Sequence, residues 1–390
     1  MNDFLGTART DLDLAGIRQK LDYLGENKIS SPLISRLEFR VRTRDLNISP
    51  DDYRLRITPS SPVLALRNRQ FQDNAIQSVN DDLQFSLNNA LEVRYKLLIR
   101  YLYYQERLRL TDQELTLLED ELKIITGESE FGDLAVDDLV ETERKITETK
   151  VDRSDLQSRL KKIALTMRDL YPFSGDISIS FDQLIGVANL NSVVVQIGSR
   201  PDTSNLIVGR KKSSLALEQA KYNIKLAETF RNLGFIEAQY RPYRADGFRN
   251  QLGFEIGFRI PIFNEDKADH QRTYLNLIED KADIARQNNR VSLEQQIAME
   301  DVSAAISKYE IIHARMEQLF PGNSLEAYKK QMLKKPEKLL KIKDNQLKMS
   351  RDLIDNLEEV YLNYIDFLDV YGKLAESPLK NFLSPALEQF

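Results

Sequence analysis

Strict alternation of apolar and charged side chains marks two short segments near the start of the chain. Residues 37–42 and residues 53–58 each carry an apolar residue at every second position, and a turn-forming segment around Pro50 separates them. A period of two places alternate side chains on opposite faces of an extended strand. The two segments therefore predict a β-hairpin over residues 36–58, with one apolar and one cationic face.

The same alternation returns about 200 residues later and is more regular there. Residues 252–263 follow residues 235–243 across a polar loop, which predicts a second hairpin over residues 235–263. The side chains predicted on the apolar faces of the two hairpins are Leu37, Phe39, Val41, Leu55, Ile57, Phe254, Ile256, Phe258 and Ile260. The charged side chains predicted on the opposite faces are Arg40, Arg42, Arg54, Arg56, Glu255 and Arg259.

Long helices are predicted for most of the remaining chain. Residues 63–125 contain neither Pro nor Gly, and apolar residues such as Leu83 and Leu87 recur there at steps of three and four. At ~1.5 Å per residue this predicts a helix on the order of 90 Å long, packed as in a coiled coil. The predicted helices are residues 63–126 and 134–171 in the first half, and residues 266–333 and 337–374 in the second half.

These elements recur in the same order, which predicts a duplicated chain. The first repeat covers residues 1–172 and begins with a lead-in helix, and the second repeat covers residues 213–390. Residues 173–212 form an irregular connector that contains a short strand or helix. The predicted fold class is mainly α with a small β part, built from a duplicated strand–strand–long helix–helix unit.

Composition excludes several classes of function. The chain has 390 residues, and its 55 basic and 60 acidic side chains give a net charge of −5, which does not favour binding to nucleic acid. Cysteine is absent and there are two histidines, so thiolate and multi-histidine metal sites are excluded. The sequence shows no nucleophile elbow, phosphate-binding loop or paired catalytic carboxylates. We therefore predict no catalytic residue, no metal and no cofactor.

Membrane and export signals are also absent from the sequence pattern. No run of ~18 apolar residues occurs, so no transmembrane helix is predicted. The first part of the chain carries Asp3, Asp11, Asp13 and Asp22 and lacks the apolar core of a signal peptide. Two interpretations remain, a cytoplasmic protein or an exported chain whose signal peptide has been removed.

The predicted hairpins create a requirement that one chain cannot meet. Four strands are too few for a barrel, and an open sheet edge beside an apolar face promotes aggregation unless it is paired. Three chains would supply about twelve strands, enough for a barrel with an internal passage. Strands of ~9–11 residues can span a lipid bilayer with apolar side chains outward and charged side chains inward.

These features resemble the TolC-type outer-membrane channels, the outer-membrane components of efflux and type I secretion systems. Residues 252–264 resemble the last strand of that family and its junction with the following helix, and residues 200–202 resemble a helix cap of the repeat. The resemblance covers essentially the whole chain. It implies a homotrimer with a shared β-barrel in the outer membrane and a helical tunnel in the periplasm. It also implies two partners, a periplasmic adaptor protein and an inner-membrane pump.

The resemblance further implies a periplasmic tip, at the turns between the long helices, where the adaptor docks. The residues that match this tip are Gly132, Asp133, Leu134, Asp138, Leu139, Pro336, Glu337, Leu339 and Leu340. The implied function is passive conduction of small molecules or polypeptides to the exterior, in multidrug efflux or type I secretion.

Two questions stay open at this point. The arginines on the strands are either a solvated sheet face or a cationic rim that favours anionic solutes, partly neutralised by Glu38 and Glu255. The chain as a whole is either the channel subunit or a soluble coiled-coil scaffold that uses its hairpins to form oligomers. The two functions differ in whether the protein needs detergent to stay in solution.

Overall fold

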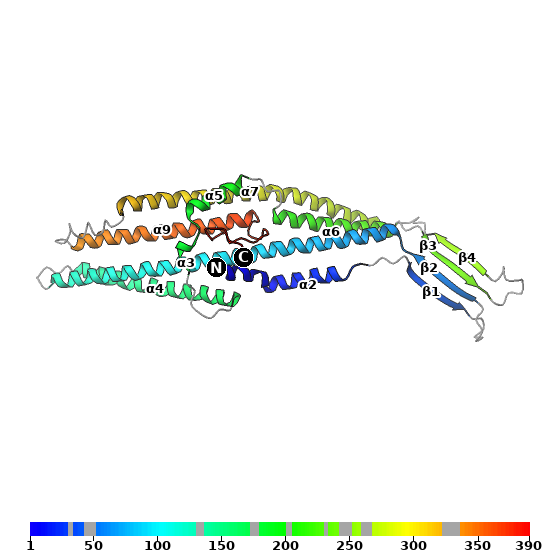
Figure 1. Ribbon diagram of the computed structural model, residues 1–390, viewed down its shortest axis with the longest axis horizontal. Coiled ribbons are helices and arrows are strands. Elements are labelled where there is room, and N and C mark those ends of the chain that lie inside the picture. The colour runs from blue at the N-terminus through cyan, green and yellow to red at the C-terminus, as the bar shows by residue number, and fades with distance from the viewer. Residues whose placement is uncertain are drawn as a thin grey trace. The chain divides into compact units, whose positions relative to one another are not determined.

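The computed structural model describes residues 1–29, 34–42, 52–129, 136–171, 179–199, 205–229, 233–241, 252–258, 267–321 and 336–390. Within these ranges the chain is mainly helical and carries one four-stranded antiparallel sheet (Figure 1). The predicted fold class, mainly α with a small β part, is confirmed at this level. The predicted division into two repeats and a connector stays a prediction.

The strands are β1 (Ile34–Arg42), β2 (Asp52–Pro59), β3 (Leu233–Tyr240) and β4 (Leu252–Phe258). The helices are α1 (Asn2–Gly6), α2 (Leu12–Glu26), α3 (Pro62–Ser129), α4 (Val136–Leu170), α5 (Val187–Gly198), α6 (Leu206–Thr229), α7 (Lys267–Leu319) and α9 (Pro336–Val370). Both α3 and α9 begin with a proline, which fits the first helical position because its missing N–H has no partner to lose there.

The chain forms two compact units, each assembled from separate stretches of sequence. The helical unit comprises Met1–Leu14, Gln84–Asn205 and Arg290–Phe390. The sheet unit comprises Ala15–Leu83 and Leu206–Asn289, and it contains all four strands. Helices α2, α3 and α7 contribute residues to both units.

The helical unit has the larger apolar core. Tyr364, Phe367 and Leu368 of α9 are fully buried, and they belong to the same cluster as Leu98 and Ile99 of α3. Side chains four or seven positions apart on a helix lie on one face, so these stripes follow from the spacing of the apolar residues in the sequence.

Two buried tyrosines satisfy their polar ends within this core. The Tyr95 hydroxyl donates a hydrogen bond of 2.9 Å to the carbonyl oxygen of Lys380, and the Tyr361 hydroxyl donates one of 2.6 Å to that of Ile185. Burial raises the pKa of both phenols above the usual range. The hydroxyls therefore act as neutral donors that attach α3 and α9 to the non-helical segments of the unit.

Ion pairs connect α3 with α4 and α7 with α9 in the helical unit. Arg153 of α4 contacts Asp112 of α3 at 2.7 Å, and Lys308 of α7 contacts Glu359 of α9 at 2.8 Å. The side chains of both pairs are exposed, so each pair adds little stability by itself. The apolar stripes account for most of the packing between these helices.

The sheet unit is organised around the first part of α3. The Gln72 side-chain amide donates a hydrogen bond of 2.8 Å to the Leu24 carbonyl oxygen of α2 and accepts one of 2.8 Å from the Ile29 amide. Asn74 donates a hydrogen bond of 3.2 Å to the Ala216 carbonyl oxygen of α6. Polar side chains of α3 therefore fix the helices on both sides of it.

The strand order in the sheet is β1-β2-β3-β4, and every neighbouring pair is antiparallel. The pair β1–β2 and the pair β3–β4 are the two hairpins that the alternation predicts. The central pair β2–β3 joins the hairpins to each other, with Leu55 opposite Ala238 and Ile57 opposite Ile236. One continuous sheet therefore combines strands from distant parts of the sequence.

Candidate functional site

The apolar face of the sheet is continuous across all four strands. In antiparallel strands, residues directly opposite each other point to the same face. The register therefore aligns three rows of side chains, Leu37–Ile57–Ile236–Ile256, Phe39–Leu55–Ala238–Phe254 and Val41–Tyr53–Tyr240–Leu252.

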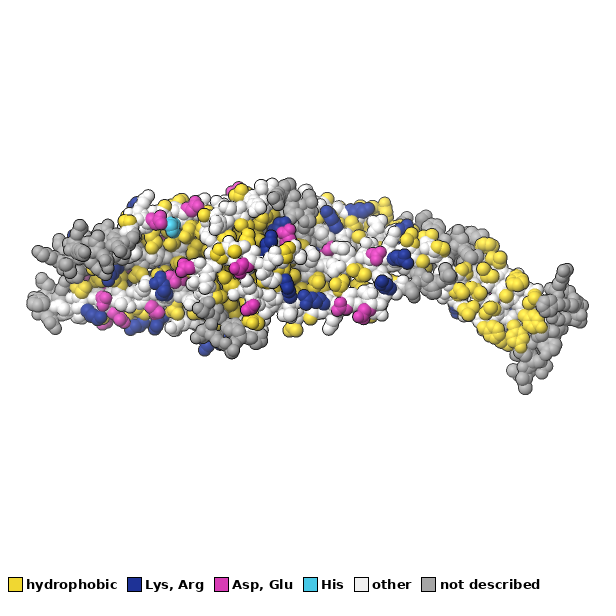
Figure 2. All heavy atoms as spheres, viewed as in Figure 1, with side chains coloured by type: hydrophobic (Ala, Val, Ile, Leu, Met, Phe, Trp, Pro, Cys, Tyr) yellow, Lys and Arg dark blue, Asp and Glu magenta, His cyan; other side chains and the backbone are white. Residues whose placement is uncertain are grey.

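This apolar face is exposed in the isolated chain. The exposed fraction is 80% for Phe254, 71% for Phe258 and 65% for Phe39. Figure 2 shows hydrophobic side chains gathered over the strands. An exposed apolar surface of this continuity is typical of a face that contacts protein or lipid.

The opposite face carries charged and polar side chains in the same regular rows. One row is Glu38–Arg56–Glu237–Glu255, and the next is Arg40–Arg54–Gln239–Gly253. Arg36 and Arg42 of β1 lie on this face as well, because they are separated from these rows by even numbers of residues.

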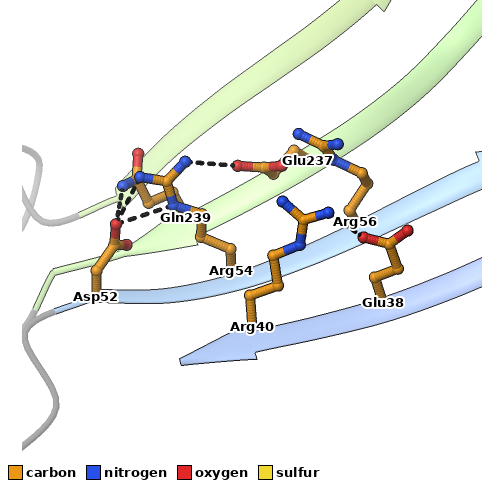
Figure 3. A network of polar contacts seen from close by, with 7 residues as sticks. All are labelled: Glu38, Arg40, Asp52, Arg54, Arg56, Glu237 and Gln239. Carbon is orange, nitrogen blue, oxygen red and sulfur yellow. Dashed lines mark hydrogen bonds and ion pairs between the residues drawn. The ribbon is translucent and has the colours of Figure 1, made fainter. Parts of the chain in front are cut away.

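An ion-pair network connects the two central strands on the charged face (Figure 3). Glu237 of β3 contacts the Arg56 Nε at 2.7 Å through one carboxylate oxygen and the Arg54 Nη1 at 3.4 Å through the other. Asp52 accepts from Arg54 at 2.8 Å and from the Gln239 amide at 2.6 Å. Two acidic residues therefore bind the two arginines of β2.

A smaller cluster repeats this arrangement on β1. Glu38 contacts Arg36 and Arg40, each at 2.6 Å. The arginines of this cluster are mostly exposed, whereas the Glu237 side chain is only 2% exposed. The least exposed ion pairs of the face therefore lie on β2 and β3, where water screens them least.

An aromatic ring completes the network and explains one glycine. The Arg56 guanidinium carbon lies 3.9 Å from the centre of the Phe235 ring, in a cation–π contact. Phe235 is opposite Gly257 on β4, and a Cβ atom at Gly257 would lie 2.3 Å from a ring carbon. The ring therefore occupies the space that any other side chain at position 257 would need.

Gly257→Ala is expected to destabilise the sheet by roughly 1–3 kcal/mol, because the Phe235 ring must leave its position over β4. The measurement is the midpoint of chemical unfolding, followed by β-sheet or tyrosine signals of the purified protein. Gly253→Ala is the matched control on the same strand, since a Cβ there would lie 3.7 Å from the Gln239 Cβ, an ordinary contact. Equal midpoints for the two variants would contradict this account of Gly257.

The described strand residues fall on the two faces in the way the alternation predicts. Arg40, Arg54, Arg56 and Glu255 share the charged face, while Arg259 and Ile260 lie outside the described residues. Sequence reasoning missed the acidic partners Asp52 and Glu237 and the amide of Gln239. The period-two pattern through residues 235–240 could have identified Glu237 and Gln239, because both occupy polar positions between apolar neighbours.

The tip residues are described only in part. Gly132, Asp133 and Leu134 lie outside the described residues, and Pro336 and Glu337 are described only as the start of α9. Asp138 is exposed on the first turn of α4, whose Leu139 is half-buried, as are Leu339 and Leu340 of α9.

A second group of charges lies between α3 and α9 in the helical unit. The Tyr103 hydroxyl donates a hydrogen bond of 3.0 Å to Asp355, which the Arg107 Nε approaches at 3.5 Å. One turn before Asp355 on α9, Arg351 pairs with Glu114 of α3. The contact between these helices is therefore partly ionic and partly buried, which makes it sensitive to changes of charge.

Glu358 of α9 lies near this group of charges, and its pKa is raised. Burial raises its pKa from 4.5 to about 7, Asp355 adds to the effect, and Arg100 and Arg107 oppose it. The folded protein therefore keeps this proton at pH values where the unfolded chain has lost it. Stability falls as the pH rises from 4.5 through 7, because ionised Glu358 is less well solvated in the folded state.

Glu358→Gln is expected to stabilise the protein above about pH 7 by about 1–2 kcal/mol, after allowance for solvent screening of a partly exposed carboxyl, and to have little effect near pH 4. The check is the thermal midpoint of both proteins at the two pH values. Glu359→Gln is the control, since Glu359 is exposed and pairs with Lys308 on the surface. A gain that is the same at both pH values would exclude titration of Glu358 as its cause.

Among the described residues, no helix combines the length and apolar character that crossing a membrane requires. The described part of the chain also contains no group of three or more His, Cys, Asp or Glu side chains able to hold a metal ion.

Comparison with known proteins gives matches among solved structures alone. No family model matches the chain, and no curated protein sequence matches it. The chain is similar to CusC, a protein described as forming a transmembrane channel, with 10% identity and a TM-score of 0.67 over 95% of this chain and 91% of that one.

Two other solved structures of outer-membrane proteins are similar to this chain in fold. The outer-membrane protein VceC of Vibrio cholerae has 9% identity and a TM-score of 0.64, over 95% of each chain. The outer-membrane channel MtrE of Neisseria gonorrhoeae, in its open state, has 14% identity and a TM-score of 0.57, over 95% of this chain and 86% of that one. In fold, this chain therefore resembles the TolC-type outer-membrane channels, as its sequence predicted.

Proposed function

We propose that this chain is a subunit of a homotrimeric outer-membrane channel. The observation that carries the proposal is the four-stranded sheet, which has one apolar exposed face, one ion-paired charged face and a strand at each edge with a neighbour on one side only among the described residues. A water-soluble sheet of this kind would expose both its apolar side chains and its unpaired backbone groups. Insertion into lipid as part of a closed barrel satisfies both.

Closure follows from strand pairing between copies. With β4 of one chain beside β1 of the next, three chains form a barrel of about twelve strands, whose interior is wide enough for a passage. The lipid side is the apolar face, with Leu37, Phe39, Phe254 and Phe258 among its residues. The inner side is the charged face, with Arg40, Arg42, Arg54, Arg56 and Glu255 in contact with water.

The helical part extends the passage into the periplasm. Three copies of its long helices form a tunnel. The ends of α4 and α9 dock on a periplasmic adaptor protein, which connects the channel to an inner-membrane pump. Lys145 of α4 interacts electrostatically with Glu121 of α3 and Asp344 of α9. This proximity supports a tip to which all three helices contribute. The tip residues named above are the proposed adaptor site.

The transport step is passive, and the partner pump supplies its energy. The cargo is small molecules or polypeptides carried from the adaptor complex to the exterior, as in multidrug efflux or type I secretion. The protein acts in the outer membrane with a periplasmic extension.

The direct test combines fractionation with conductance. The chain is produced behind an export signal in a Gram-negative host, the membranes are separated, and the protein is extracted with detergent and weighed by native mass spectrometry. Purified protein is then added to planar lipid bilayers. We expect detergent-dependent extraction from outer membranes, a mass of three chains, and discrete conductance steps.

A different result would favour the soluble scaffold. In that case the protein stays in the supernatant without detergent after membranes are pelleted, and bilayers show no steps. An apolar face buried between copies in water would then replace the face against lipid.

A further inference from the structure

We propose that Glu237 sets the ion selectivity of the barrel passage, by holding Arg54 and Arg56 against the sheet and compensating their charge. This inference rests on the proposed function, because it takes the charged face to line the passage. Glu237 acts here as a positioning residue that works through two arginines.

Glu237 is placed to serve both arginines at once. Its side chain is 2% exposed, and its two carboxylate oxygens contact different guanidinium groups, Arg56 at 2.7 Å and Arg54 at 3.4 Å (Figure 3). It lies on β3, one strand away from both, in register with Arg56. A buried carboxylate between two guanidinium groups is stable only while both contacts persist.

The contacts keep two long side chains close to the strand surface. Arg56 also lies over the Phe235 ring, and Arg54 also binds Asp52 at 2.8 Å. As a result the Arg54 side chain is 30% exposed and the Arg56 side chain 25%. An unrestrained arginine can extend by several ångströms, so these contacts also keep the guanidinium groups out of the passage.

The other charges of the face nearly balance among the described residues, with Arg36, Arg40 and Arg42 on one side and Glu38 and Glu255 on the other. Glu38 binds Arg36 and Arg40 at 2.6 Å each. A charged face whose cations and anions alternate at contact distance produces a weak field a few ångströms above it, because opposite charges cancel. The wild-type barrel is therefore expected to distinguish poorly between small anions and cations.

Loss of the Glu237 charge changes this balance in every chain of the trimer. In Glu237→Gln, Arg56 loses its carboxylate partner and Arg54 keeps only Asp52. The substitution removes one negative charge per chain, so one positive charge on this part of the face is no longer compensated, and the Arg56 guanidinium is free to extend toward the water. A ring of such groups attracts anions and repels cations.

The experiment measures the reversal potential of single channels in planar bilayers that separate two concentrations of KCl. Glu237→Gln is expected to raise the chloride-to-potassium permeability ratio about fivefold, which corresponds to slightly less than one kT of added potential for a univalent ion. A purely structural role of Glu237 would alter the yield of channels and leave their reversal potential unchanged.

A double-mutant cycle separates positioning from simple loss of charge. Arg56→Gln should shift the permeability ratio toward potassium by a larger factor in the Glu237→Gln protein than in the wild type, because only there is Arg56 unpaired. The matched control is Glu255→Gln, which removes a charge from the same face and the same row on β4. Arg56 and Glu255 are separated by strand β3, so their effects on the logarithm of the ratio should add.

The outcomes distinguish a failure of the Glu237 inference from a failure of the proposed channel function. Conducting wild-type channels whose permeability ratio does not change in Glu237→Gln would overturn the inference and leave the channel function intact. Additive effects of Glu237→Gln and Arg56→Gln would also overturn it. If the single variant forms no channels, the Glu237→Gln/Arg56→Gln protein replaces it, and a ratio equal to that of Arg56→Gln alone overturns the inference. An absence of conductance in the wild type would instead refute the proposed function.

Discussion

Phe254→Arg is expected to prevent stable insertion of the protein into the outer membrane. Phe254 is 80% exposed in the isolated chain, so the substitution removes few contacts within the chain. Against lipid, however, an arginine near the middle of the bilayer costs ~2–4 kcal/mol per chain, and a trimer carries three. The measurement is the amount of trimer recovered from purified outer membranes by native gel electrophoresis.

The control for this prediction is Glu255→Arg, the next residue of the same strand on the opposite face. It introduces the same side chain where the proposed passage contains water, so the yield of trimer should remain close to that of the wild type. Equal loss in both variants would point to a general weakness of β4. Equal recovery of both would show that the apolar face does not contact lipid.

Phe367→Ala is expected to cost ~3–5 kcal/mol of stability in the helical unit. The Phe367 side chain is fully buried on α9, and its ring centre lies 4.4 Å from that of Tyr371. Truncation leaves a cavity inside the largest apolar cluster of the described chain, and the surrounding helices relax only partly. Thermal unfolding in detergent, followed by the helical circular dichroism signal, should show a large fall in the midpoint.

Phe367→Leu separates cavity formation from other effects of the change. Leucine keeps most of the buried apolar volume, so its cost should be well below that of alanine. The sheet unit does not contain Phe367, so the β-sheet contribution to the spectrum of the folded protein should stay unchanged in both variants. Similar midpoints for alanine and leucine would contradict the burial of this ring.

The local structure could be predicted from the sequence because its determinants are themselves local. The strict alternation in residues 37–42 and 252–258 predicts strands with two different faces, and the structure has strands there. Similarly, the lack of Pro and Gly in residues 63–125 predicts one long helix, and α3 covers Pro62–Ser129. Periodicity identifies such elements well, since it depends only on neighbouring residues.

The ends of elements were predicted less accurately. The helix predicted at residues 337–374 ends at Val370 in the structure. Gly372 has a φ of 65°, and its amide donates to the Asp369 carbonyl while the Lys373 amide donates to the Leu368 carbonyl. This is a Schellman motif, which closes a helix with a left-handed glycine just beyond its last turn.

The candidate site could be predicted only in part, because it depends on pairing between distant strands. The positions of the arginines on one face followed from alternation, but their partners on β3 did not. No periodic signal shows that Arg56 lies opposite Glu237, because that neighbourhood arises when the two hairpins pair. Asp52 and Glu237 lie beside Arg54 and Arg56 on this face, and alternation alone does not predict that proximity.

The central pairing of the sheet has a consequence for the order in which the protein acquires its structure. Each hairpin can form from contacts close in sequence, whereas Asp52 and Gln239 meet across 187 positions. Closing so long a loop is slow, since its entropy must be lost before the contacts repay it. During folding the first hairpin therefore stays unpaired on one edge, with its apolar side chains uncovered, until the second hairpin joins it. Chaperones that shield this intermediate should therefore raise the yield of folded protein.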